Sequence, residues 1–432
     1  MLFKDISYVD DHYNVINHVN ILIESNKIVS IGKDIPENYN GTVYNGNNKI
    51  ALPGFINTHC HVPMVLQRGY GDDLPLDRWL HERMFPFEDR MNSEHMYWGS
   101  LLGISEMIKS GVVSFSDMYM YIEGITRAVD ESGIKANIGR GCSSFDENQS
   151  FNELLAYQET KWLLDTIKTR EDDRIKCDAA IHAEYTATKR LVTDVAQFAK
   201  EFGLRIQVHI SETSAEHQES KKRRNGLTPT QFLDKLGVFE VPVIAAHCVW
   251  IDDNDIAILH KNNATISYCP SSNLKLGSGF LNAWKLLNIG INISIGTDGA
   301  ASNNNLNGLE EINLASMLQK GLNQDPVCFN MAETLKIATM NGAKAQGREE
   351  CGSIKIGNRA DIVVFDLDKP HLQPACNPLA NILYAAQAND ICLTMVDGQV
   401  LYKDNELLTI DEEKVIYNCK EIQKNILKEM NK

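Results

Sequence analysis

The chain has 432 residues, of which 42 are Lys or Arg and 57 are Asp or Glu, so its formal net charge is −15 with histidine neutral. This acidic balance argues against nucleic acid as the main partner, because phosphate binding requires a concentrated basic surface. Hydrophobic residues make up 43% and charged residues 23% of the chain, which excludes a disordered, collagen-like or small disulfide-rich protein and fits an α/β barrel of about 250 residues with a smaller domain.

The first residues, MLFKDISYVDDHYNV, contain neither a basic start followed by an apolar run nor a glycine at position 2. We therefore expect no secretory signal and no myristoyl anchor. No run of about 18 apolar residues without a charge occurs, so no membrane span is expected. The ten cysteines are scattered without a Cys-x-x-Cys pair, which favours free thiols in a reducing cytoplasm over a disulfide framework or a cysteine zinc site.

Short β-branched segments with turn residues occur at both ends of the chain. ISYVDD and HVNILIESNKIVSIGKDI lie within residues 1–50, and GSIKIGNRADIVVFDLD and CLTMVDGQVLYKDNELL lie within residues 352–408. Asn26, Asp397 and Gly398 stand where hairpin turns are expected. We predict that the two ends pair in one small β-sandwich domain, which is discontinuous in sequence.

Eight short runs rich in apolar and β-branched residues lie in the segment 51–351. In chain order they are FINTHCH (55–61), VVSFSDM (112–118), KANIGRG (135–141), KCDAAIHAE (176–184), RIQVHISE (205–212), VPVIAAHCV (241–249), ATISYCP (264–270) and INISIGTDG (291–299). Amphipathic segments separate most of them; in one, Met96, Leu101, Ile104 and Ile108 approximate a helical stripe before Gly111. Eight strands alternating with helices predict an α/β fold, a (β/α)8 TIM-type barrel. The alternative, a doubly wound open sheet, is weakened because no Gly-x-Gly-x-x-Gly follows an early strand.

A basic run, Lys221 to Arg224, lies between the fifth and sixth predicted strands. In an acidic protein we interpret it as a solvated face or loop rather than a nucleic-acid site.

The last segment, residues 409–432, predicts an amphipathic helix that packs on the rest of the protein. Its apolar residues are Val415, Ile416, Cys419, Ile422, Ile426 and Leu427.

Polar residues gather at the carboxyl ends of the predicted strands, the face on which barrel enzymes carry their active sites. His59 and His61 end the first run, His182 the fourth, His209 and Glu212 the fifth, His247 the sixth and Asp298 the eighth. Since His59 and His61 are two residues apart, both imidazoles project to one side of their strand, with Cys60 turned the other way.

His59, His61, His209 and Asp298 form an N₃O set suited to zinc or another borderline divalent metal. A lone histidine on an apolar strand is more often a buried core residue, but four such side chains at strand ends favour a metal site. A metal with an open coordination position lowers the pKa of its bound water to about 7 and so provides hydroxide at neutral pH. Asp298 can contact the metal and accept the water proton, while Glu212 is free to act as a separate acid or base.

Five segments carry a family resemblance: PGFINTHCHVPM, GYGDDLPLDRWL, VHISE, AAHC and IGTDGAASNN. They resemble the signature segments of the amidohydrolase superfamily and, within it, of the 5′-methylthioadenosine/S-adenosylhomocysteine deaminases. The match runs in order through essentially the whole chain and includes GNRADIVVFD in the predicted β domain. It implies hydrolytic, metal-dependent deamination of the 6-amino group of S-adenosylhomocysteine, 5′-methylthioadenosine or adenosine, yielding the inosine analogue and ammonia.

The resemblance also implies catalytic roles. His59, His61, His209 and Asp298 would hold one divalent metal per chain, Zn²⁺ in the usual description of the family, although manganese, iron or nickel suit the same ligands. Glu212 would protonate the purine and pass the proton to ammonia, with His247 orienting the nucleophile. Binuclear members carry a carboxylated lysine at the end of the fourth strand, where this chain has His182, so one metal is expected.

The resemblance implies five further substrate contacts: Trp79 at the ribose and thioether side, Glu88 at the ribose hydroxyls, Arg140 at the ligand tail, His182 at the purine and Ser302 at the ring edge. Glu212 and Asp298 would contact the substrate as well. The structural alternatives are a surface pair for Glu88 and Arg140, a core aromatic for Trp79 and a buried strand histidine for His182.

The same metal centre also serves deamination of guanine or another free heterocycle and dechlorination of triazines, and some related barrels are non-catalytic assembly modules. Glu88 and Trp79 favour a nucleoside, because a free base has no ribose hydroxyls. The complete ligand set with Glu212 disfavours a non-catalytic role. We expect a small-molecule nucleoside as the ligand of a cytoplasmic homo-oligomer, with neither nucleic acid nor membrane as partner.

Overall fold

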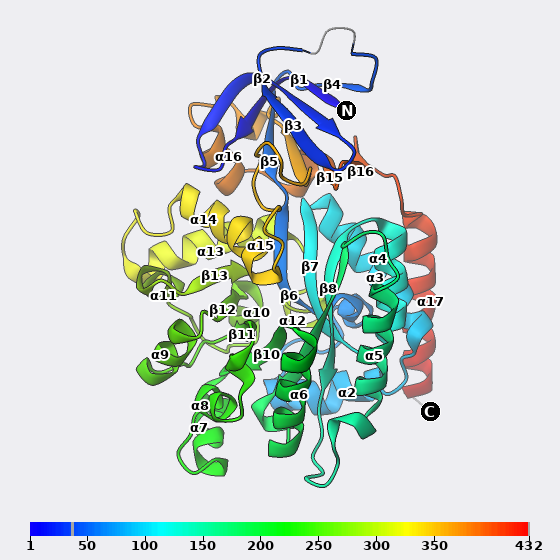
Figure 1. Ribbon diagram of the computed structural model, residues 1–432, viewed down its shortest axis with the longest axis vertical. Coiled ribbons are helices and arrows are strands. Elements are labelled where there is room, and N and C mark those ends of the chain that lie inside the picture. Colours follow the sequence, from blue (N-terminus) through cyan, green and yellow to red (C-terminus); the bar gives the residue numbers. More distant parts are fainter. Residues whose placement is uncertain (36–38, 431–432) are drawn as a thin grey trace.

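The computed structural model describes residues 1–35 and 39–430, which form an eight-stranded barrel with a second, mixed sheet at one end of it (Figure 1). The barrel strands follow one another in chain order: β6 (Phe55–Cys60), β7 (Val112–Tyr119), β8 (Lys135–Cys142), β9 (Ile175–Ala183), β10 (Ile206–Ile210), β11 (Val243–His247), β12 (Thr265–Tyr268) and β13 (Asn292–Ile295). All paired neighbours are parallel. The eight predicted strands are therefore confirmed.

The first and last barrel strands meet and close the ring. The Asp298 N–H donates to the His59 carbonyl at 3.0 Å, and the Thr58 hydroxyl donates to the Ile295 carbonyl at 2.9 Å. Closure brings the carboxyl ends of β6 and β13 together, and with them His59 and Asp298. The predicted TIM-type barrel is confirmed, and the open-sheet alternative is wrong.

Helices cover the outside of the barrel (Figure 1). One of them is α3 (Ser93–Lys109), whose stripe Met96, Leu101, Ile104 and Ile108 is buried as predicted. The chain leaves it through Gly111, whose φ of +83° suits glycine. The remaining helices of the barrel region are α1 (Leu76–Trp79), α2 (Phe85–Glu88), α4 (Ile122–Ser132), α5 (Leu155–Ile167), α6 (Lys189–Phe202), α7 (Ser214–Arg223), α8 (Pro229–Lys235), α9 (Asp253–Lys261), α10 (Pro270–Lys275), α11 (Ala283–Ile289), α12 (Ala300–Asn303), α13 (Gly308–Asn323), α14 (Met331–Ala338) and α15 (Met340–Gln346), with the short turns η1 (Val62–Gln67) and η2 (Leu80–Met84).

The second sheet is built from both chain ends. Its strands are β1 (Leu2–Val9), β2 (Val15–Glu24), β3 (Lys27–Gly32), β4 (Val43–Asn45), β5 (Lys49–Pro53), β14 (Ile362–Asp366), β15 (Ile391–Val396), β16 (Gln399–Lys403) and β17 (Glu406–Leu407), with α16 (Pro378–Tyr384) between β14 and β15. Phe3, Ile21 and Ile28 share a buried cluster with Ile362 and Leu393, so strands from both chain ends pack on one core. The predicted pairing of the two chain ends is therefore confirmed, and their strands form a single mixed sheet.

The turns between the strands of this sheet fall where they were predicted. Asn26 lies between β2 and β3. Asp397 and Gly398 connect β15 to β16, both with positive φ, at 47° and 76°. A two-residue connection with this backbone is the usual one in a β-hairpin.

The junction with the barrel places the second sheet away from the carboxyl ends of the barrel strands. β5 extends past the predicted boundary at residue 50 and continues through Gly54 into β6. A Cβ at position 54 would lie 2.2 Å from the Val113 side chain, so only glycine fits there. The mixed sheet consequently sits at the amino ends of the barrel strands (Figure 1).

The carboxyl-terminal segment forms α17 (Glu412–Met430), which lies along the barrel beside α3 (Figure 1). Val415, Cys419 and Ile426 are buried, and the Gln423 amide donates to the Leu66 carbonyl at 2.8 Å. The predicted final helix is thus present, although its last two positions, 431 and 432, lie outside the described residues.

The basic run lies at the end of α7, where Lys222 and Arg223 are exposed, so the predicted solvated face is confirmed. Two of its arginines also have a partner inside the protein. Arg223 and Arg224 each contact a carboxylate oxygen of the fully buried Glu184 at 2.6 Å. They neutralise a carboxylate that would otherwise be buried without a partner.

The ten cysteines are free. Within the part of the chain that the structure describes, no helix is both long and apolar enough to cross a membrane.

Candidate active site

A cavity of about 470 Å³ opens at the carboxyl ends of the barrel strands, a volume typical of small-molecule sites. Ten of the eleven predicted site residues line it: His61, Trp79, Glu88, Arg140, His182, His209, Glu212, His247, Asp298 and Ser302. The eleventh, His59, is 1% exposed, and its ring centroid lies 4.9 Å from that of His61 and 4.8 Å from that of His209. The structure therefore brings all of them together.

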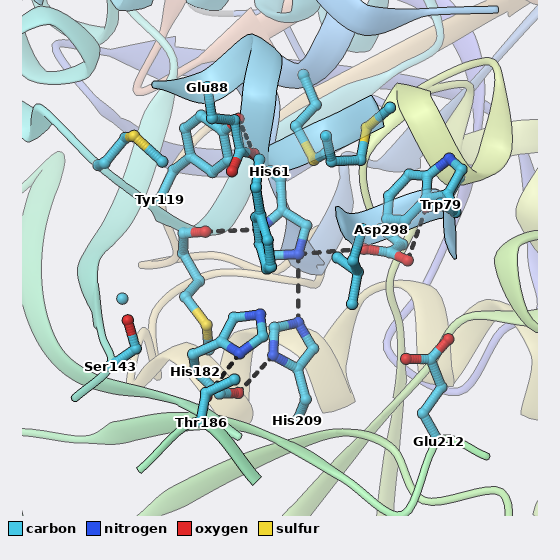
Figure 2. A pocket seen from close by; sticks show the side chains of 18 of the residues that line it. His61, Trp79, Glu88, Tyr119, Ser143, His182, Thr186, His209, Glu212 and Asp298 are labelled. Atoms are coloured by element: carbon cyan, nitrogen blue, oxygen red, sulfur yellow. Dashed lines mark hydrogen bonds and ion pairs between the residues drawn. The ribbon is translucent and has the colours of Figure 1, made fainter. Parts of the chain in front are cut away.

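The four predicted metal ligands point their donor atoms at one another. Figure 2 shows His61 between Asp298 and His209. Its Nε2 lies 3.3 Å from Asp298 Oδ1 and 3.2 Å from His209 Nε2, and His59 Nε2 lies 3.5 Å from the same carboxylate oxygen. Donors bound tetrahedrally to one ion at about 2.0–2.1 Å stand roughly 3.4 Å apart. The observed spacing fits such a set.

The environment of His59 is a second observation that these four residues suit a metal ion. Its Nε2 is buried and has no hydrogen-bond partner. Burying an unpaired polar atom is unfavourable, and such atoms are rare in folded proteins. A cation shared with His61, His209 and Asp298 would satisfy this nitrogen.

Hydrogen bonds from Nδ1 orient two of the histidines. His61 Nδ1 donates to the Met118 carbonyl and His209 Nδ1 to the His182 carbonyl, both at 2.6 Å. Since a carbonyl only accepts, the ring proton lies on Nδ1 and the lone pair on Nε2. Both rings therefore present the tautomer that binds a metal through Nε2.

Asp298 is held by the loop that follows β13. Its backbone has a φ of 59°, and its Oδ2 accepts hydrogen bonds from the Ser272 and Ser302 hydroxyls at 2.6 and 2.8 Å. Burial alone would raise the pKa of Asp298, but the imidazoles of His59 and His61, whose Nε2 atoms lie 3.5 and 3.3 Å from its Oδ1, hold it well below its usual value. The carboxylate is ionised and its orientation is fixed from both sides.

Ser302 was predicted to contact the ring edge of a substrate. It lines the cavity, but its hydroxyl is used within the protein, since it donates to Asp298 and lies 3.0 Å from the Gly299 carbonyl.

Glu212 is buried on the same side of the cavity as Asp298 (Figure 2). Burial, and secondarily repulsion by Asp298, raises the pKa of Glu212 to about 8, so this carboxyl is neutral at pH 7 in the absence of a metal. Its Oε2 lies 3.9 Å from His247 Nε2. Burial lowers the pKa of His247 to about 4, so that ring is neutral too.

A second carboxyl, Glu216, fixes the backbone at Glu212. Its oxygens accept hydrogen bonds from the N–H groups of Ser211 at 2.9 Å and Glu212 at 2.7 Å. Ser211 has a φ of 48°, a conformation that non-glycine residues adopt only where the surroundings enforce it. Glu216 therefore supports the turn that carries Glu212 into the cavity.

The opposite wall of the cavity comes from the segment between β6 and α3. Glu88, at the end of α2, accepts a hydrogen bond from the Tyr119 hydroxyl at 2.5 Å, and burial raises its pKa. Trp79 is 6% exposed and its indole N–H is buried without a partner. Four methionines, Met64, Met84, Met118 and Met120, also line the cavity.

Arg140 and His182 line the cavity, and both have protein partners. The Arg140 guanidinium pairs with Glu159 and donates to the Gly141 carbonyl. His182 Nδ1 lies 2.9 Å from the Thr186 hydroxyl, and burial lowers the pKa of this ring to about 4. The alternative in which Glu88 pairs with Arg140 at the surface is wrong, because Glu88 contacts Tyr119.

Sequence reasoning missed the residues that support the site from the segment after β12. Ser272, Asn273 and Ser278 contact Asp298, His247 and Glu212 respectively. The signal was available, because Pro270 to Asn273 directly follow a predicted strand, where polar side chains point into the site of a barrel.

One further buried carboxyl near this region gives a stability prediction. Glu311 accepts hydrogen bonds from Asn303 Nδ2 and the Ser271 N–H, and burial raises its pKa from 4.5 to about 8. Between these values the folded state binds a proton that the unfolded state has lost, so the contribution of Glu311 to stability falls as the pH rises. Glutamine cannot ionise. We expect the free energy of unfolding of Glu311→Gln, relative to wild type, to increase from about pH 4.5 to about pH 8 and then level off.

Urea unfolding on both sides of this pH window measures that difference. Glu310→Gln is the matched control, because Glu310 is exposed, and its difference from wild type is expected to stay constant. Parallel curves for Glu311→Gln and wild type would contradict the assignment of a proton to Glu311.

Comparison with known proteins agrees with the geometry. The sequence profile of the amidohydrolase family matches residues 50–401. The chain is 41% identical over 430 residues to a 5-methylthioadenosine/S-adenosylhomocysteine deaminase of Dictyoglomus turgidum, with 99% of each chain covered. It is 43% identical over 407 residues to a 5′-deoxyadenosine deaminase of Methanocaldococcus jannaschii, with 93% of this chain and 95% of that protein covered.

A solved structure extends this agreement to three dimensions. An adenosine deaminase from Xanthomonas campestris with bound zinc matches with a TM-score of 0.92 at 27% identity, over 99% of this chain and 98% of that chain. The family profile covers more than half of the chain, and both relatives exceed 30% identity over nearly its full length. The chain therefore belongs to the amidohydrolase family.

Proposed function

We propose that this protein is a metal-dependent hydrolase that replaces the 6-amino group of a 5′-modified adenosine with oxygen and releases ammonia. The observation that carries the proposal is the set of His59, His61, His209 and Asp298 donors around the buried, unpaired His59 Nε2, with the carboxyl of Glu212 beside it in the same cavity. The relatives named for 5-methylthioadenosine, S-adenosylhomocysteine and 5′-deoxyadenosine deamination support the same reaction.

The four donors would hold one Zn²⁺ ion, the metal to which an N₃O set at this spacing is suited. When bound, such an ion lowers the pKa of a coordinated water to about 7 and thereby supplies the nucleophile. A single ion fits the chain because the fourth strand carries His182 instead of a lysine at its carboxyl end.

Glu212 and Asp298, near the proposed metal position, carry out different proton transfers. Glu212 donates a proton to the ring nitrogen beside the amino group, which makes the neighbouring carbon electrophilic. Asp298, ionised, accepts the proton of the attacking water. Glu212, now ionised, takes the proton of the added hydroxyl and passes it to the amino group, which leaves as ammonia while the carbonyl forms. The proton held by Asp298 then returns to Glu212, which restores both carboxyls. His247 Nε2 holds the oxygen that is being added.

The rest of the cavity would select the nucleoside. Glu88, fixed by Tyr119, would accept hydrogen bonds from the ribose hydroxyls. Trp79 and the cavity methionines offer an apolar surface to a 5′ thioether, a polarisable group that packs well against sulfur and aromatic rings. His182 would face the purine and Ser302 its edge. Arg140 would approach the 5′ substituent while Glu159 holds its guanidinium.

The proposal is tested by incubating zinc-loaded protein with 5′-methylthioadenosine, S-adenosylhomocysteine, 5′-deoxyadenosine and adenosine, with guanine as the control. We expect the adenine absorbance to change to that of hypoxanthine with release of one ammonia per nucleoside. Turnover of guanine without turnover of any nucleoside would favour a free-base deaminase and overturn the proposal.

Glu88→Gln tests the ribose contact. We expect KM for nucleosides to rise roughly 10- to 100-fold with a small change in kcat, because a hydrogen bond to a charged group contributes about 1.5–3 kcal/mol. Steady-state kinetics with a 2′,3′-dideoxy nucleoside is the control, since that substrate lacks both hydroxyls and its KM is expected to be equal in the two proteins. An unchanged nucleoside KM would mean that Glu88 does not bind the ribose.

A further inference from the structure

The segment that follows β12 contacts three different groups of the site. From α10 and the turn after it, the Ser272 hydroxyl donates to Asp298 Oδ2 at 2.6 Å, and the Ser278 hydroxyl donates to Glu212 Oε1 at 3.2 Å. Between them, Asn273 Nδ2 lies 2.9 Å from His247 Nδ1. These three side chains are at most 4% exposed. One short stretch of chain thus supports a proposed metal ligand, Asp298, and its two neighbours Glu212 and His247.

The contact between Asn273 and His247 determines where the imidazole carries its proton. In the structure the Asn273 amide turns Nδ2 toward the ring, and since an amide nitrogen only donates hydrogen bonds, His247 Nδ1 accepts in this arrangement and the ring proton lies on Nε2. Nε2 is the nitrogen that lies 3.9 Å from the Glu212 carboxylate, on the cavity side of the ring. His247 is consequently a donor toward the cavity.

Two of the proposed ligand histidines, His61 and His209, have the opposite hydrogen-bond partner at Nδ1. Each Nδ1 donates to a backbone carbonyl, which leaves a lone pair on Nε2. Behind His247 stands an amide N–H. Neighbouring rings in the group His59, His61, His209 and His247 have centroids at most 5.5 Å apart. Proximity therefore does not distinguish a possible metal ligand from a hydrogen-bond donor. The partner of Nδ1 distinguishes His61 and His209 from His247.

We propose that Asn273 is a positioning residue that holds His247 in the tautomer protonated at Nε2, so that this ring donates a hydrogen bond into the cavity and stays out of the metal ligand set. Ser278, from the same segment, holds the Glu212 carboxyl beside it. The expected effect on catalysis rests on the proposed function. The tautomer can be measured in the folded protein whether or not the protein is active.

The tautomer is measured directly by ¹⁵N NMR of the imidazole nitrogens in zinc-loaded protein, with a His247→Gln variant to assign the signals. In wild type we expect the proton of His247 on Nε2. Asn273→Asp places an acceptor of the same shape behind Nδ1 and is expected to move the proton to Nδ1. Wild-type protein with the proton on Nδ1, or an Asn273→Asp variant with an unchanged tautomer, would overturn the proposal.

Kinetics provide the second readout. Asn273→Ala and Asn273→Asp are expected to lower kcat about 10- to 100-fold, the usual effect of removing such a supporting hydrogen bond, with KM unchanged and one metal retained per chain. Ser278→Ala is expected to have a smaller effect of the same kind. Ser271→Ala is the matched control in the same helix, because its hydroxyl faces Glu311 instead, and it is expected to keep full activity.

The outcomes separate this inference from the proposed function. A raised KM with unchanged kcat, or loss of the metal in the Asn273 variants, would show that Asn273 supports the substrate or metal site and would overturn the proposal. Wild-type protein without deaminase activity would contradict the proposed function, while the NMR spectrum of that same protein would still decide the tautomer. Asn273→Asp, which conserves side-chain shape, keeps the test valid if Asn273→Ala fails to fold.

Discussion

Glu212→Gln is expected to lower kcat for nucleoside deamination by about 10²–10⁴-fold, the contribution of a positioned general acid or base. The carboxyl is buried beside Asp298, its pKa is raised to about 8, and Ser278 holds one of its oxygens. Glutamine keeps the shape and the contact with Ser278 but carries no transferable proton. The expected signature is therefore a fall in kcat with little change in KM, measured by steady-state absorbance kinetics.

Glu311→Gln is the matched control for Glu212→Gln. Burial raises the pKa of Glu311 to about 8 as well, yet its carboxyl contacts Asn303 and Ser271 and is not among the residues that line the cavity. We expect this variant to keep wild-type activity. Near-full activity in Glu212→Gln would remove Glu212 from the chemistry, and an equal loss in both variants would point to a general effect of neutralising a buried carboxyl.

Asp298→Ala is expected to abolish deamination, with activity reduced by about 10⁴-fold or more, because one substitution removes both a proposed metal ligand and the proposed acceptor of the water proton. It also removes the carboxylate to which Ser272 and Ser302 donate. Metal analysis is expected to give less than one ion per chain.

Thermal unfolding distinguishes loss of the metal from loss of the proton acceptor. A metal that binds only the folded state stabilises it by mass action, so a chelator is expected to lower the Tm of wild type and to leave that of Asp298→Ala nearly unchanged. Asp298→Asn retains a weaker oxygen ligand and is expected to recover some metal without recovering activity. Full metal content in Asp298→Ala would exclude Asp298 from the ligand set.

Much of the site could be predicted from the sequence because, in a parallel barrel, residues at the ends of different strands lie at the same rim. Alternation along a strand turns His59 and His61 to one side, and every parallel strand ends at the same rim. His209, His247 and Asp298 had to meet them there once eight strands closed. Neither step depends on the detailed course of a loop.

The contacts made by the individual side chains could not be predicted in the same way. Arg140 pairs with Glu159, Arg223 and Arg224 with Glu184, and Ser302 donates to Asp298. Their partners depend on rotamers and on loops whose paths are set by packing between distant segments.

The sequence by itself determined the eight-stranded barrel, the sheet made from both chain ends and the group of histidines at one rim. Strand periodicity and strand order are visible in the sequence, and closure of the barrel brings the carboxyl ends of the strands to one rim. Only the tertiary structure decided which imidazoles turn a lone pair, and which a proton, toward the cavity. That choice depends on the atom behind each ring: a carbonyl behind His61 and His209, an amide N–H of Asn273 behind His247. Those partners come from neighbouring strands or from the helix after β12, and they meet the rings only when the barrel is folded.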